Sequence, residues 1–230
     1  MRMTQILLWL NGFLWFLFFY MVFFVVPSDA AQGVAQRIFY FHVPTAWVSF
    51  TAFTVSFIAS IRYLKKRDLQ LDKLAAAYAV TGWIFTTGVM ITGPLWAKPI
   101  WGDFWNWSDQ RLMSFFVLWL LFAAYGLLRF SMPDSEKRAR FSAVLAILGF
   151  LNVPLVYAAI RIWNTPSHPA AVIAGKKGSG LKDPTMLWTF FIGVIAFHFL
   201  MWALARALKT YYIQKSTVEQ QIWKNEFKGE

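Results

Sequence analysis

The sequence predicts an all-α integral membrane protein with six transmembrane helices. Only 14% of its 230 residues are charged, whereas a soluble domain has about 25%, and the mean hydropathy is +0.48. The apolar residues also gather into six runs of roughly 20 residues, the length that a helix needs to cross the hydrocarbon core. Helices are expected rather than strands, because lipid offers no water to backbone groups and the runs lack the alternation of a barrel.

The six predicted spans follow one another with short polar breaks between them. The first is interpreted as a retained span rather than a signal peptide, since Arg2 is the single charge before it and no small-residue cleavage site follows. Breaks rich in Gly, Pro, Ser and charged residues separate the later spans. No internal repeat or separate soluble domain is found, so residues 1–230 are expected to form one membrane domain. The predicted spans are Ile6–Val26, Pro44–Leu64, Leu74–Trp96, Leu112–Phe130, Phe141–Ile162 and Leu187–Ala207.

The distribution of lysine and arginine predicts the orientation. With the N-terminus inside, 15 of the 22 basic residues lie in the inner segments and seven in the outer ones. The positive-inside rule then places both termini in the cytoplasm. This topology predicts an external tryptophan-rich loop over residues 97–111, an external loop over 163–186 that contains His168, and a cytoplasmic tail over 208–230.

Composition and missing motifs exclude several functions. The net charge of +11 could serve nucleic acid, but basic cytoplasmic loops that face membrane lipid account for it without any soluble basic domain. The chain contains no cysteine, which excludes disulfides and thiolate metal sites. It also lacks Walker, GxSxG and HExxH motifs. We therefore predict neither nucleic-acid binding nor enzymatic activity.

The stretch WGDFWNWSDQR places three tryptophans within seven residues, interleaved with charged residues. One interpretation is an interfacial aromatic belt, which suffices for the other tryptophans of the chain. A belt requires neither interleaved charges nor a glycine such as Gly102. We therefore favour an aromatic shelf for a flat ligand, formed by Trp101, Trp105 and Trp107. On a helix Trp101 and Trp105 would share one face and Trp107 would point elsewhere.

Two of the three histidines lie on the same predicted membrane face as this shelf. His42 is near the outer end of the second span, and His168 is in the external loop. Two imidazoles without acidic or cysteine partners suit zinc poorly, but they suit haem, whose porphyrin leaves only axial positions to the protein. Arg37, Arg111 and Arg161 on this face would pair with haem propionates, or alternatively with lipid phosphates.

The third histidine, His198, falls midway along the sixth predicted span. It lies roughly 16 Å below the outer end of that helix at 1.5 Å per residue, which is too deep for the shelf. An ionisable residue inside a membrane is a functional candidate by default. We favour a neutral, hydrogen-bonded packing residue, with a second haem ligand as the alternative.

Four stretches, in this order, resemble the haem exporter protein C family (CcmC) of the wider tryptophan-rich, or WWD, haem-handling superfamily. They are RIFYFHVPTAW at Arg37–Trp47, GPLWAKPIWGDFWNW at Gly93–Trp107, RLMS at Arg111–Ser114 and WNTPSH at Trp163–His168. The resemblance implies that His42 and His168 are the external axial ligands of haem iron. It also implies that the haem-facing residues include Arg37, Trp101, Gly102, Trp105 and Trp107.

The tryptophan motif departs from the family pattern at one position. The family usually has Trp-Gly-x-x-Trp-x-Trp-Asp, whereas here Ser108 follows Trp107 and the aspartate comes one residue later, as Asp109. Arg111 and Leu112 then follow in the expected register. An inserted residue is the simplest account, and it assigns the aspartate position to Asp109.

The resemblance implies a multi-pass protein of the bacterial inner membrane that binds haem b non-covalently and transiently on its outer face. It would present this haem to the chaperone CcmE, in a complex with CcmA, CcmB and CcmD. Three alternatives are a larger haem lyase or cytochrome c synthetase, a b-type electron-transfer cytochrome, and a haem-free transporter with an aromatic vestibule. The length of 230 residues argues against the first, and the single intramembrane histidine against the second.

Overall fold

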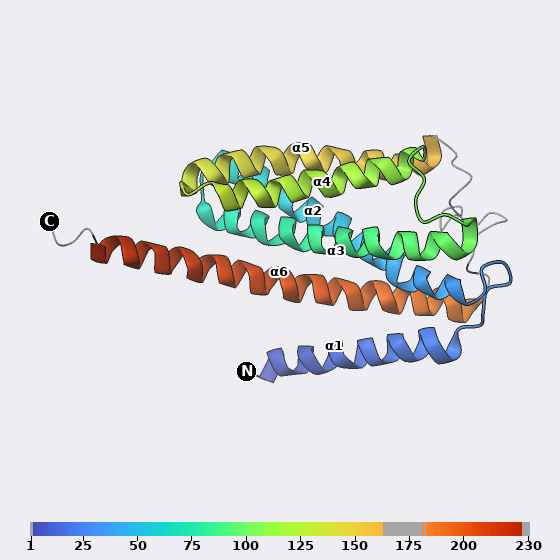
Figure 1. Ribbon diagram of the computed structural model, residues 1–230. Helices are drawn as coiled ribbons and strands as arrows, with labels where there is room; N and C mark the ends of the chain where they lie inside the picture. The colour runs from blue at the N-terminus through green and yellow to red at the C-terminus, as the bar shows by residue number, and fades with distance from the viewer. Residues whose placement is uncertain (1, 163–180, 182, 227–230) are drawn as a thin grey trace.

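The computed structural model is a bundle of long α-helices that run side by side (Figure 1). It describes residues 2–162, 181 and 183–226. No strand occurs within these residues, so the predicted all-α class is confirmed for them. Helix α1 (Arg2–Tyr20) continues into a π-helical turn, η1 (Met21–Val25), and a 3₁₀ turn, η2 (Val34–Ile38), leads into the second long helix. The remaining helices are α2 (Phe39–Lys66), α3 (Leu69–Trp101), α4 (Gln110–Ser131), α5 (Ser135–Ile162) and α6 (Pro184–Glu226).

Five of the described helices, α2 to α6, are long and apolar enough to cross a membrane. A shorter apolar helix, Trp9–Val25, precedes them. The protein is therefore a multi-pass membrane protein, and the sixth crossing stays a prediction. Both termini lie at one end of the bundle, and the α1–α2 and α3–α4 connections lie at the other (Figure 1). The side of the membrane that each end faces also stays a prediction.

The helices extend beyond the predicted spans, because hydropathy measures apolar length whereas local capping decides where a helix ends. Helix α2 begins at Phe39, so His42 lies in its first turn rather than before it. Helix α3 continues to Trp101 and ends at Gly102, whose φ of 86° is left-handed and favours glycine. Helix α6 continues to Glu226, so most of the predicted tail prolongs this helix past the others (Figure 1).

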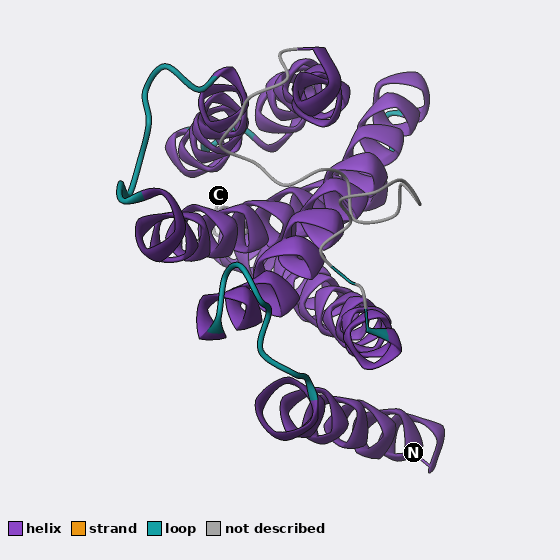
Figure 2. Ribbon diagram, turned by 90° about the vertical axis from the view of Figure 1, so that its right-hand side faces the viewer, coloured by secondary structure: helices purple, strands orange, loops and turns teal. Residues whose placement is uncertain are grey.

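Helices α2 and α3 form the centre of the bundle. One apolar cluster joins them to α1 and α6, and a second joins them to α4 and α5. In the second cluster the rings of Phe53 and Phe122 stack with centroids 3.6 Å apart. Gly82 of α3 allows this stack, since a Cβ there would come within 2.5 Å of the Phe53 ring. Helix α1 packs on α6 at the edge of the bundle, which is clear in the end-on view (Figure 2).

A buried ion pair joins α3 to α4 near the terminal end of the bundle. Arg129 donates to both carboxylate oxygens of Asp72, at 2.6 and 3.0 Å, and the two side chains are 11% and 8% exposed. The guanidinium also lies 5.8 Å from the ring of Tyr125 and 5.9 Å from that of Tyr212 on α6. Three helices therefore meet at one cation.

We predict that Asp72→Ala strongly destabilises the bundle. The change leaves the Arg129 guanidinium buried without its carboxylate, and breaking such a pair costs about 3–5 kcal/mol. Thermal unfolding of the purified protein in detergent should show a clearly lower midpoint. Lys137→Ala is the control, because Lys137 and Asp134 form an exposed pair at 3.9 Å. Equal midpoints for the two variants would contradict this role of Asp72.

Candidate functional site

His42 is held against α3 at the end of the bundle that carries the tryptophan loop. Its Nδ1 lies 2.9 Å from the hydroxyl of Thr92, and that hydroxyl donates to the carbonyl oxygen of Gly88 at 2.8 Å. The His42 ring packs against the Trp96 ring, with centroids 5.6 Å apart. Gly93 permits this approach, since a Cβ at that position would lie 3.3 Å from His42 Cε1. One face of α3 thus fixes the imidazole ring.

Trp96 connects His42 to the loops around it. It is 3% exposed, and its indole N–H donates to Oε1 of Gln32, in the segment before α2, at 3.0 Å. Its ring also lies 6.4 Å from that of Trp101. Sequence reasoning assigned Trp96 to a belt or to core packing, and core packing is confirmed, but its link to His42 was missed. The spacing of Thr92 and Trp96, four residues apart on one helix face, was the available signal.

The tryptophans of the loop do not form one shelf of the predicted geometry. The prediction that Trp101 and Trp105 share a helix face is wrong, because α3 ends at Gly102. Trp101 packs next to Trp96, whereas the rings of Trp105 and Trp107 lie 5.8 Å apart at 65° to each other.

Helix α4 supports the Trp105–Trp107 pair. Both rings contact Phe116, with centroids 6.2 and 6.1 Å away. Trp107 is nonetheless 68% exposed, and Phe104 of the same loop is 54% exposed. The loop therefore presents aromatic surface outward, in two groups rather than on one plane.

Asp109 anchors the tryptophan loop to α4. Its carboxylate is the N-cap of this helix, accepting from the backbone N–H groups of Arg111 at 2.9 Å and Leu112 at 3.2 Å. The residue is 5% exposed, whereas Ser108 is exposed and its N–H donates to the side chain of Asn106. Of these two residues, Asp109 is therefore the buried one, in the position to which the inserted residue shifts the aspartate of the motif.

Cationic and polar groups converge on the same end. The Arg111 guanidinium lies within electrostatic reach of both His42 and Asp109. The Nε atom of Arg37, in the last turn of η2, is buried without a hydrogen-bond partner among the described residues, and so is Nε1 of Trp105. An unsatisfied buried polar group costs about 1–3 kcal/mol, so such atoms call for a further partner.

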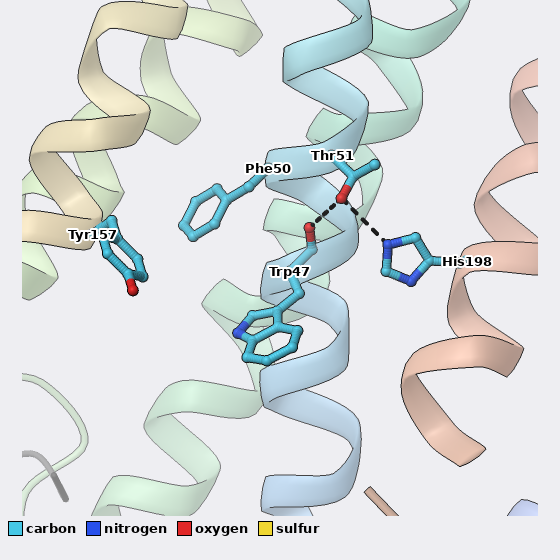
Figure 3. Close-up of a pocket in the computed structure, with 5 residues that line it drawn as sticks. All are labelled: Trp47, Phe50, Thr51, Tyr157 and His198. Carbon is cyan, nitrogen blue, oxygen red and sulfur yellow. Dashed lines mark hydrogen bonds between the residues drawn. The ribbon is translucent and has the colours of Figure 1, made fainter. Parts of the chain in front are cut away.

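His198 of α6 forms hydrogen bonds within its own helix and to α2 (Figure 3). Its Nδ1 donates to the carbonyl oxygen of Val194 at 2.7 Å, since a carbonyl can only accept, and Nε2 faces the Thr51 hydroxyl at 3.3 Å. It lines a pocket of about 270 Å³ with Thr51, Trp47, Phe50 and Tyr157. The interpretation as a hydrogen-bonded packing residue is confirmed. The alternative of a second haem ligand stays an untested prediction.

The second predicted ligand, His168, lies outside the described residues, and so does the side chain of Arg161. The structure therefore brings His42, Arg111 and the tryptophan loop together but does not test the His42–His168 pair. Over the ranges that the structure describes, His, Cys, Asp and Glu side chains do not gather in groups of three or more that could hold a metal ion.

Fold and site together define a multi-pass helical membrane protein with an aromatic, histidine-containing surface at one end. The model of the heme exporter protein C family (CcmC) matches residues 1–224. The chain belongs to this family, and membership implies a role in haem handling for cytochrome c maturation.

Individual relatives agree with this assignment. Heme exporter protein C of Bradyrhizobium diazoefficiens is 35% identical over 176 residues, which cover 76% of this chain and 66% of that protein. A cytochrome c biosynthesis ccmC-like mitochondrial protein of Marchantia polymorpha is 35% identical over 202 residues, covering 86% and 83%. Heme exporter protein C of Escherichia coli K12 is 30% identical over 165 residues, covering 72% and 66%. The matched segment thus spans just under two thirds of the Bradyrhizobium and Escherichia proteins.

We predict that Asp109→Ala destabilises the loop end of α4, whereas Ser108→Ala is nearly neutral. Loss of an N-cap side chain typically costs about 0.5–2 kcal/mol, and Asp109→Asn should keep most of this contribution because asparagine also caps. Thermal unfolding in detergent measures the three variants side by side. A larger effect at Ser108 than at Asp109 would show that the cap assignment is wrong.

Proposed function

We propose that this protein binds haem b non-covalently and transiently at the outer face of the bacterial inner membrane and presents it to the chaperone CcmE. The observation that carries the proposal is the His42–Trp96–Trp101 arrangement at one end of the bundle, in a chain of the heme exporter protein C family. A neutral imidazole that packs on buried Trp96, with the exposed ring of Trp101 next to it, suits an iron porphyrin, which needs nitrogen ligands and a contact surface for a flat ring.

The other residues at this end fit the same cargo. Haem carries two propionates, and the forked guanidinium groups of Arg37 and Arg111 are suited to binding carboxylates. The buried, unsatisfied Nε of Arg37 and Nε1 of Trp105 would gain a partner from such a ligand. His42 would hold the iron on one side, and we assign His168 as the second axial ligand.

In this proposal the chain positions haem and catalyses no reaction itself. His42 would hold the iron, the arginines would orient the propionates, and Trp101, Gly102, Trp105 and Trp107 would contribute the surface that excludes water. Covalent attachment to the chaperone would use the chaperone's own residue and the chemistry of haem. Asp109 acts indirectly, because its cap fixes the loop on α4.

The proposed orientation follows from the charge distribution. With 15 of 22 basic residues at the terminal end, both termini face the cytoplasm and the tryptophan loop faces outward. That side gives the membrane-anchored chaperone access to the loop. The complex would also include CcmA, CcmB and CcmD.

We predict that His42→Ala loses most of the haem that co-purifies with the protein, because an axial ligand is removed. The absorbance in the Soret region, measured per mole of protein, reports the loss. His198→Ala is the matched control and should keep the parent spectrum, since His198 bonds to Thr51 and Val194. Haem loss from the His198 variant with retention in the His42 variant would place the site inside the membrane and refute the proposal.

We also predict that Trp105→Ala and Trp107→Ala each reduce haem loading of the chaperone, with the double variant much weaker. Aromatic contacts contribute about 0.5–1.5 kcal/mol each beyond area burial, so a single loss weakens the complex without abolishing it. The amount of haem-loaded chaperone, normalised to membrane protein level, is the measurement. Trp9→Ala is the control, because this tryptophan is 80% exposed on α1. Unchanged haem loading in the double variant would show that these tryptophans form only an interfacial aromatic belt and do not contact haem.

A further inference from the structure

The Thr92 hydroxyl lies between His42 and the backbone of α3. The direction of its single proton determines which ring nitrogen of a neutral His42 carries a proton. The oxygen lies 2.8 Å from the carbonyl oxygen of Gly88 and 2.9 Å from His42 Nδ1. A hydroxyl has one proton to donate, and a carbonyl oxygen can only accept. If the proton pointed to Nδ1 instead, two oxygen acceptors would face each other at 2.8 Å. The proton therefore lies toward Gly88, and Thr92 accepts a hydrogen bond from Nδ1–H.

The same helix contains an unambiguous example of this arrangement. Five residues earlier, the Thr87 hydroxyl donates to the carbonyl of Trp83 at 2.8 Å and accepts from Nε1 of Trp119 at 2.9 Å. An indole nitrogen can only donate, so Thr87 must be the acceptor. Thr92 repeats both distances with His42 in the place of Trp119.

A neutral imidazole that carries its proton on Nδ1 has its lone pair on Nε2. Nε2 of His42 makes no hydrogen bond within the part of the chain that the structure describes. Gly93 and Trp96 restrict the ring further, so that both the tautomer and the ring orientation are fixed before any ligand arrives. Fixing the tautomer through the non-ligating nitrogen is how proteins prepare a histidine for a metal.

We propose that Thr92 is a positioning residue that holds His42 as the Nδ1–H tautomer and leaves Nε2 as the atom that binds haem iron. This inference rests on the proposed function for its ligand, but the tautomer itself is a property of the ligand-free protein. Without the hydroxyl, the neutral ring can carry its proton on Nε2, and this proton must move to Nδ1 before Nε2 can bind iron. Loss of such a partner typically weakens metal binding by about 10–100-fold.

The test compares Thr92→Val, which keeps the shape and removes the hydroxyl, with Thr92→Ser, which restores it. Thr87→Val is the matched control, because it removes an equivalent hydroxyl from the same helix. Nitrogen NMR of the ligand-free protein, labelled at histidine and with His42→Ala to assign the signal, reports the tautomer in mildly alkaline solution. Titration with haem reports affinity.

We expect the Nδ1–H signature in the parent, in Thr92→Ser and in Thr87→Val. Thr92→Val should show Nε2–H character at His42 and bind haem about 10–100-fold more weakly. The positioning role of Thr92 is refuted if Thr92→Val retains the Nδ1–H signature. It is also refuted if Thr92→Ser fails to restore the Nδ1–H signature and the haem affinity. Should His42→Ala bind haem normally, the proposed function fails instead, while the NMR comparison still decides the role of Thr92.

Discussion

The packing of α2 against α3 is the interaction on which both the bundle and its site depend. These two helices belong to both apolar clusters, and glycines of α3 set how closely they approach. Gly82 makes room for the Phe53 ring, and Gly93 makes room for His42. The imidazole therefore meets Thr92 and Trp96 as a consequence of the same contact that assembles the core. A slip of one residue between the helices would separate His42 from its hydroxyl partner, so the site depends on the register of α2 against α3.

Polar side chains at the two ends of the bundle make different kinds of contact. At the terminal end, Asp72 and Arg129 saturate each other, and Lys73 donates to Ser216 of α6 at 2.7 Å. These contacts cross between helices and hold α6 against α3. At the loop end, aromatic rings are exposed, and buried nitrogens of Arg37 and Trp105 have no hydrogen-bond partner among the described residues. A buried polar group without a partner calls for an explanation, and under the proposed function the ligand would supply one for Arg37 and Trp105.

The sequence predicted the helical class and the approximate position of the membrane spans, because apolar length is a local property that hydropathy measures directly. It could not predict where α3 ends, since that depends on a left-handed conformation at Gly102, and the assumption of a helix through Trp105 misplaced the tryptophan rings. His42 was selected from its motif, but its partner Thr92 lies 50 residues away in the chain. Such a pairing is created by helix packing, and no local pattern contains it. The burial of Asp109 also follows only once α4 is seen to begin beside it.

A haem-delivery site must hold its haem and must also release it to a partner. The arrangement at the loop end is suited to both requirements. His42 stands on a helix, with its ring fixed by α3, so one ligand loses little freedom when the cargo arrives. Several of the other proposed contacts come from connections: Trp105 and Trp107 from the loop between α3 and α4, and His168 from the segment between α5 and α6. Contacts made by loop side chains contribute individually modest free energies, about 0.5–1.5 kcal/mol for each aromatic pair, and can be exchanged one at a time. Under the proposed function, His42 would hold the haem from a fixed position, and the loop residues would hold it through contacts that a partner can replace. A site with all its contacts on packed helices would lack such replaceable contacts.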